Sequence, residues 1–227
     1  MRIEAANTNL LFYLLMAASI LVSRIPYVGK YLRVVHTLVH ESGHGIMAML
    51  TSGNVQSIEL FASTEGKATT TSSNAFSRFL QALAGYPATS LTAWMFFFWI
   101  QTEQTALPLF VILGIGLICL ILFIRNIYGI FWLLSFCALL IFIVYRQVKT
   151  EEYIAAVIIS SLILIDSFIY PFHLLYISIN NPAQAGDAKN LKDMTHIPAF
   201  FWACIFVLFS GFMTWKTLQL FPSFATL

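Results

Sequence analysis

Long apolar runs dominate this sequence, and each is about as long as a lipid bilayer is thick. A helix that crosses the hydrocarbon core needs about 20 mostly apolar residues. Runs of roughly this length recur at residues 9–23, 31–51, 78–100, 107–124, 127–145, 153–178 and 198–218. They predict an all-α polytopic membrane protein with about seven transmembrane helices.

The composition agrees with a chain embedded in a lipid bilayer. Of the 227 residues, 59% are hydrophobic and 10% are charged, whereas soluble domains carry roughly 25% charged residues. So few polar side chains cannot coat a water-exposed surface. The formal net charge of +2 is too small to indicate a nucleic-acid partner.

One segment, residues 52–74, differs from the apolar runs around it. It contains a short β-prone stretch with Val55, Ile58 and Leu60, then a turn signal around Gly66, and then a threonine-rich stretch. Two β-prone stretches separated by a glycine-containing turn are typical of a β-hairpin. We expect one short membrane-associated β-hairpin at about residues 52–74, within a single domain that covers residues 1–227.

The segment His40-Glu41-Ser42-Gly43-His44 carries the clearest chemical signal. Residues four apart on a helix share a face, so both imidazoles can bind one metal ion. Glu41, next to the first ligand, would act as the general base on a water that zinc (Zn2+) activates. Two histidines and a glutamate are costly inside a bilayer-spanning helix unless they have partners, which favours a functional role.

His36 lies one helical turn before His40, on the same face. It could be a ligand, a proton carrier, or a side chain that supports the ligands. We favour a supporting or structural role, because His40, His44 and one acidic residue complete the expected ligand set.

Zinc sites need a third protein ligand, and two aspartates are the main candidates. Asp166 lies near the middle of the run at residues 153–178, where an unpaired carboxylate is hard to explain without a metal or a cation. Asp187 lies in a polar connection, where a solvated or helix-capping aspartate is ordinary. We prefer Asp166 because its depth matches that of His40 and His44, and we keep Asp187 as the alternate ligand. His173 is a weaker candidate.

The chain resembles the site-2 protease family of intramembrane zinc metalloproteases, in particular its small bacterial members. The resemblance rests on the His40-Glu41-x-x-His44 motif within a membrane helix and on the hairpin at residues 53–70 that follows it. It rests also on the segment Ala-Gly-Tyr-Pro-Ala-Thr-Ser at residues 84–90, which is similar to the family's Ala-Gly-Pro-x-x-Asn segment. In this segment, Gly85, Pro87 and Ser90 are candidates for supporting the metal or for binding substrate.

The resemblance implies further properties. The family's third ligand is the aspartate of a Leu-Asp-Gly motif, in place of which this chain has Ile-Asp-Ser around Asp166 and Gly-Asp-Ala around Asp187. The hairpin would offer an edge to which an unwound substrate segment adds as a strand. The location implied is a bacterial cytoplasmic membrane, with the protein crossing it several times.

We therefore expect an intramembrane zinc metalloendopeptidase that hydrolyses peptide bonds of membrane-anchored protein substrates. A non-proteolytic zinc-binding membrane scaffold and a metal or ion transporter are the alternatives. The sequence shows no internal repeat of the kind found in many transporters. Substrate selection would come from the membrane core or from a partner subunit.

Overall fold

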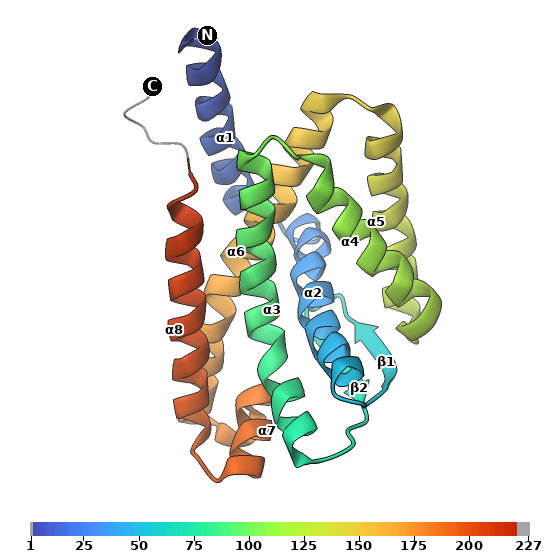
Figure 1. Cartoon of the computed structure of the whole chain (residues 1–227), viewed down its shortest axis with the longest axis vertical. Helices are drawn as coiled ribbons and strands as arrows, with labels where there is room; N and C mark the ends of the chain where they lie inside the picture. The colour runs from blue at the N-terminus through green and yellow to red at the C-terminus, as the bar shows by residue number, and fades with distance from the viewer. Residues whose placement is uncertain (1, 222–227) are drawn as a thin grey trace.

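The computed structural model describes residues 2–221, with the side chains of residues 10–221. A long helix occurs at each of the seven apolar runs (Figure 1). These helices are α1 (Arg2–Ser23), α2 (Val28–Leu50), α3 (Ala75–Gln101), α4 (Ala106–Ile118), α5 (Ile127–Arg146), α6 (Lys149–Asn180) and α8 (Ala199–Leu218). A π-helical turn, η1 (Cys119–Phe123), continues α4, and the shorter η2 (Pro182–Gln184) and α7 (Gly186–Thr195) connect α6 to α8.

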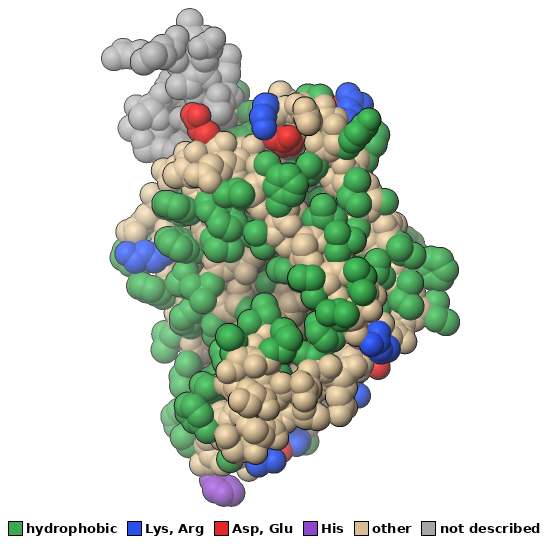
Figure 2. Space-filling view, turned by 45° about the vertical axis from the view of Figure 1, so that its right-hand side comes forward, with side chains coloured by type: hydrophobic (Ala, Val, Ile, Leu, Met, Phe, Trp, Pro, Cys, Tyr) green, Lys and Arg blue, Asp and Glu red, His purple; other side chains and the backbone are tan. Residues whose placement is uncertain are grey.

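Four helical segments of the described chain are long and apolar enough to cross a membrane: Ala106–Phe123, Ile127–Arg146, Lys149–Asn180 and Ala199–Leu218. A fifth is added if the bent pair Leu10–Ser23 and Val28–Leu50 counts as one span. Figure 2 shows hydrophobic side chains over the middle of one face, with most charged side chains nearer its two ends. The chain is thus an integral membrane protein, as the sequence predicts, and the number of seven crossings stays a prediction.

The bend between α1 and α2 is sharp, because the two helix axes differ by 105°. Pro26 lies in the break, and Tyr27 has a positive φ of 64°. A Cβ atom on Gly29 would lie 2.3 Å from the carbonyl oxygen of Ser23, so only glycine allows the chain to turn this tightly. The bend directs α2 into the centre of the bundle.

Helix α2 is buried along much of its length, and it packs closely against α3. A Cβ atom on Gly43 would approach the Cβ atom of Ala88 to 2.6 Å and the carbonyl oxygen of Ala84 to 3.2 Å. Small residues at such a crossing let two helix backbones come together within a membrane. The face of α2 that carries the histidines therefore lies directly against α3.

The predicted hairpin is present beside α2. Strands β1 (Val55–Leu60) and β2 (Gly66–Thr70) are antiparallel, with Ile58 opposite Ala68. The outer edge of β1 is covered at the turn between η1 and α5. There Ile58 bridges Ile124, and the side-chain amide of Asn126 donates to Leu60 O at 2.6 Å and accepts from Leu60 N at 3.2 Å. No comparable strand pairing covers β2 within residues 2–221, so β2 presents the open edge of the sheet.

Candidate metal centre

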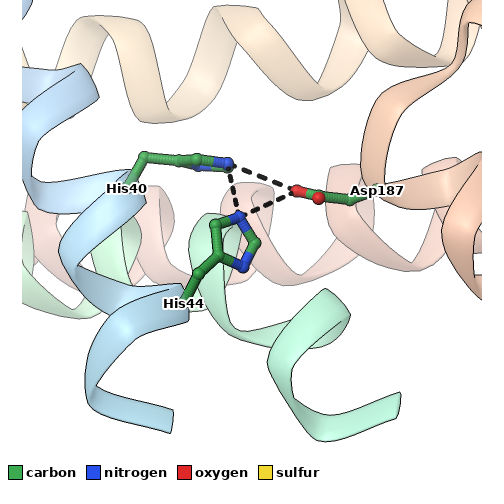
Figure 3. Close-up of side chains that lie close together, drawn as sticks. All are labelled: His40, His44 and Asp187. Carbon is green, nitrogen blue, oxygen red and sulfur yellow. Dashed lines mark hydrogen bonds and ion pairs between the residues drawn. The ribbon is translucent and has the colours of Figure 1, made fainter. Parts of the chain in front are cut away.

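Three potential metal-binding atoms converge where α2 meets α7 (Figure 3). His40 and His44 lie one turn apart on α2, and their Nε2 atoms are 3.1 Å apart. From α7, Asp187 Oδ2 lies 3.3 Å from each of these nitrogens. Of the histidines, cysteines and acidic residues that the structure describes, these three form the only group with metal-site spacing.

The spacing of these atoms fits zinc. Four ligands at the vertices of a tetrahedron, each about 2.0 Å from zinc, lie about 3.3 Å from one another. The observed separations of 3.1, 3.3 and 3.3 Å therefore match one face of such a tetrahedron. Three protein ligands with one open position is the arrangement of catalytic zinc sites.

The tautomer of His44 also suits a metal ligand. Its Nδ1 lies 2.7 Å from the backbone carbonyl oxygen of Gln81 on α3, and only a protonated Nδ1 can donate to that oxygen. In the neutral form of this ring, the metal-binding form, Nε2 carries the lone pair and faces the cluster. Metal-bound histidines are commonly held by such a hydrogen bond from the second ring nitrogen.

Gly85 leaves the space that the two imidazoles occupy. A Cβ atom at this position would lie 2.5 Å from His40 Nε2 and 2.6 Å from His44 Nε2. Because the clash would fall on the ligand atoms themselves, any larger residue at Gly85 would displace them. This glycine of the segment at residues 84–90 thus lies directly against the cluster.

The structure places Asp166 outside the cluster. Its carboxylate accepts two hydrogen bonds from Arg33 Nε, of 3.0 and 2.9 Å, and its side chain is 2% exposed. Depth in the membrane indicates that a carboxylate needs a positive partner, but not whether that partner is a metal or an arginine. Here the partner is Arg33, so the geometry favours the alternate candidate, Asp187, over the preferred Asp166.

Asp187 is held as an anion by the histidines. Its partial burial alone would raise the pKa of the carboxyl group. The charge of His44, with hydrogen bonds from His40 and His44, instead lowers that pKa well below its ordinary value. An ionised carboxylate is the form that binds a metal.

Glu41 is buried and lies beside the cluster, where strand β2 fixes its surroundings. The backbone of Ala68 lies beside its carboxylate. A Cβ atom on Gly66 would lie 2.7 Å from Glu41 Oε1, so the start of β2 passes directly over the glutamate. Glu41 on α2 is therefore packed against β2.

The cluster and Glu41 line a cavity of about 810 Å³. Its walls come from α2, β2, α3, α6 and α7, and most of the residues that line it are polar. The lining residues outside the cluster include Thr37, Thr64, Gly66, Ala68, Thr70, Gln81, Tyr86, Tyr170, Asn190 and Asp193. A cavity of this size has room for water beside Glu41.

Of the other candidate residues, His36 lines the cavity, whereas Pro87 and Ser90 do not. His36 lines the cavity and stacks on Tyr170, with ring centroids 4.9 Å apart and planes inclined by 13°. Its Nε2 is buried and has no hydrogen-bond partner within the described chain. Pro87, inside α3, and the buried Ser90 are not among the residues that line the cavity.

Several site residues were not singled out from the sequence. Gln81 supplies the carbonyl oxygen for His44, and the ring of Tyr86 packs edge-on against His40 with centroids 4.8 Å apart. Gln81 is a polar residue one helical turn before Gly85, within a mostly apolar run. That spacing could have indicated that Gln81 lies near the site. No sequence pattern distinguishes Tyr86 from an ordinary packing aromatic.

Comparison with known proteins gives one result. A protein-family model described as peptidase M50B-like matches residues 13–217. No curated protein and no solved structure matches the chain. The family match covers the cluster, Glu41, the hairpin and the cavity.

Proposed function

The chain belongs to the peptidase M50B-like family, and on that premise we propose that it is an intramembrane zinc metalloendopeptidase. The substrates would be membrane-anchored proteins, cut within or beside their transmembrane segments. The resemblance to the site-2 protease family seen in the sequence is confirmed by the family match. The identity of the metal, the roles of the residues and the substrate class remain parts of this proposal.

The observation that carries the proposal is the convergence of three ligand atoms beside a buried glutamate. His40, His44 and Asp187 would hold zinc, with their atoms 3.1 to 3.3 Å apart. Zinc bound there would polarise the scissile carbonyl group and make a water molecule more acidic. Asp187 takes the place that the sequence analysis gave to Asp166.

Glu41 would then move the proton. Its carboxylate would accept a proton from the attacking water and deliver it to the amine nitrogen that leaves. Gly66 of β2 packs against this carboxylate. That contact supports a position for Glu41 beside the cluster.

The open edge of β2 would bind the substrate. The backbone of Lys67, Thr69 and Thr71 faces β1, as the bond from Thr71 N to Asn54 O indicates, so alternate residues Gly66, Ala68 and Thr70 face outward. A substrate segment could add to this edge as a strand. A transmembrane helix satisfies all its peptide groups internally, so it must unwind before it can be cut.

The test compares zinc content with cleavage in detergent-purified protein. Glu41→Gln should keep about one zinc per chain and abolish cleavage, whereas His44→Ala should lose both. The matched control is Glu103→Gln, in the exposed loop after α3, which should behave as wild type. A Glu41→Gln variant that still cleaves would overturn the mechanism. Zinc binding without cleavage in the wild type would favour a scaffold instead.

A further inference from the structure

The turn between the two hairpin strands is held by side chains from two helices. Thr64, in this turn, has a φ of 72°, a left-handed conformation that a β-branched residue rarely adopts. Its carbonyl oxygen accepts a hydrogen bond from Thr37 Oγ1 on α2, at 2.6 Å. Its Oγ1 lies 2.8 Å from the phenol oxygen of Tyr170 on α6. We refer to Thr37, Thr64 and Tyr170 as the turn latch.

Tyr170 is oriented in turn by Arg33, which is itself paired with Asp166. Arg33 Nη2 donates to the phenol oxygen of Tyr170 at 3.2 Å, while Arg33 Nε is paired with Asp166. Because arginine only donates, the phenol oxygen accepts this bond and its proton is available to Thr64 Oγ1. The Arg33–Asp166 ion pair, which has no part in the proposed chemistry, thus supports the turn latch.

The turn latch lies immediately before the part of β2 that contacts the site. Gly66, two residues after Thr64, packs against Thr37 and Glu41: a Cβ atom there would lie 2.5 Å from Thr37 Cγ2 and 2.7 Å from Glu41 Oε1. Ala68, two residues further, lines the cavity together with Glu41. A displaced turn would therefore move the open edge of β2.

A two-stranded hairpin is marginally stable alone, so its position depends on such attachments. Asn126 fixes the end of β1 through Leu60, and the turn latch fixes the start of β2. A left-handed threonine persists only where its surroundings impose that conformation. The two hydrogen bonds to Thr64 supply this constraint.

We propose that the turn latch holds β2 in the position that binds substrate, which makes Thr37 and Tyr170 positioning residues for a strand-adding peptide. This inference rests on the proposed peptidase function. Without the turn latch, β2 would have to be ordered when the substrate binds, and that cost would weaken binding. KM should rise while kcat changes little, since the metal ligands and Glu41 remain in place.

The test uses full-length protein in detergent with two readouts. Tyr170→Phe and Thr37→Val each remove one hydrogen bond of the turn latch, and Tyr176→Phe, an exposed tyrosine on the same helix, is the matched control. Hydrogen–deuterium exchange of residues 61–70 without substrate should be about tenfold faster in the two latch variants, the effect expected for one hydrogen bond. KM for a cleaved membrane-anchored substrate should rise about tenfold, with kcat nearly unchanged.

Variants of Thr64 keep the test independent of Tyr170. Thr64→Val removes the hydroxyl group and Thr64→Ser keeps it, so faster exchange is expected in the first and not in the second. Wild-type exchange in Tyr170→Phe and Thr37→Val would overturn the turn latch, whether or not the protein cleaves. Faster exchange with an unchanged KM, or with a loss confined to kcat, would overturn the positioning role. A zinc-loaded wild type that cleaves nothing would overturn the proposed function, and exchange would still decide the turn latch.

Discussion

Arg33 Nε donates to both carboxylate oxygens of Asp166, at 3.0 and 2.9 Å. This contact explains why a carboxylate can lie in the middle of α6 without a metal, because the guanidinium group supplies the positive partner that its burial requires. The aspartate that lies beside His40 and His44 is instead Asp187, at the start of α7. The two aspartates therefore have separable roles, one structural and one as a proposed ligand.

Zinc content should separate these roles. Asp187→Ala should lower the affinity for zinc more than 100-fold. Removing only an outer partner of a metal ligand typically lowers it 10–100-fold. Asp166→Asn should keep about one zinc per chain, but lower the free energy of unfolding by about 3 kcal/mol, because Arg33 loses its charged partner. Metal analysis and thermal unfolding in detergent measure the two effects. Loss of zinc only in the Asp166 variant would restore Asp166 as the ligand.

Gly85→Ala should weaken metal binding without removing a ligand. The new methyl group would fall 2.5 Å from His40 Nε2, so the imidazoles must move apart and their spacing would no longer match a tetrahedral face. We expect a loss of zinc affinity of at least about tenfold, as for other disturbances of ligand orientation.

The control for this variant is Gly114→Ala on α4, where an added Cβ meets no atom within 4 Å. Both variants replace a helical glycine by alanine and gain similar helix propensity. Competition with a fluorescent zinc chelator would measure the affinities. Equal affinities in the two variants would refute the role of Gly85.

Zinc should stabilise the folded protein through the cluster, whatever the enzyme cleaves. A ligand at 1,000 times its dissociation constant adds about 4 kcal/mol to the free energy of unfolding. Wild-type protein stripped with a chelator should therefore unfold at a lower temperature, and added zinc should restore the original value. His44→Ala should show neither response. A zinc-dependent shift of the same size in His44→Ala would place the metal elsewhere.

Much of the architecture could be predicted from the sequence, because the signals that define it are local. Apolar runs of bilayer length predicted the positions of the long helices, and the polar segment at residues 52–74 predicted the hairpin. The spacing of His40 and His44 brought two ligand atoms together through helix geometry alone. Each of these inferences needs only residues that are close in the chain.

The partners that come from distant segments could not be predicted in the same way. Asp166 lies within an apolar run and Asp187 in the polar connection after it, and only the packing of α6 and α7 decides which one reaches His40 and His44. Arg33 lies two turns before His40, so its pairing with α6 depends on how these two helices cross. The amide of Asn126, which pairs with a strand far away in the sequence, carries no pattern that marks it.

Asn126 provides the last prediction, because its side chain replaces a missing strand. It donates to Leu60 O at 2.6 Å and accepts from Leu60 N at 3.2 Å. Both backbone polar groups of Leu60, at the outer edge of β1, are therefore paired. Asn126→Ala should lower the free energy of unfolding by about 1–3 kcal/mol, since both backbone groups lose their partner. Asn126→Asp should cost more than Asn126→Ala, because an ionised carboxylate cannot donate and its charge would face the oxygen of Leu60. Chemical unfolding in detergent would give the order of the three proteins, and an aspartate variant as stable as wild type would contradict this account of the β1 edge.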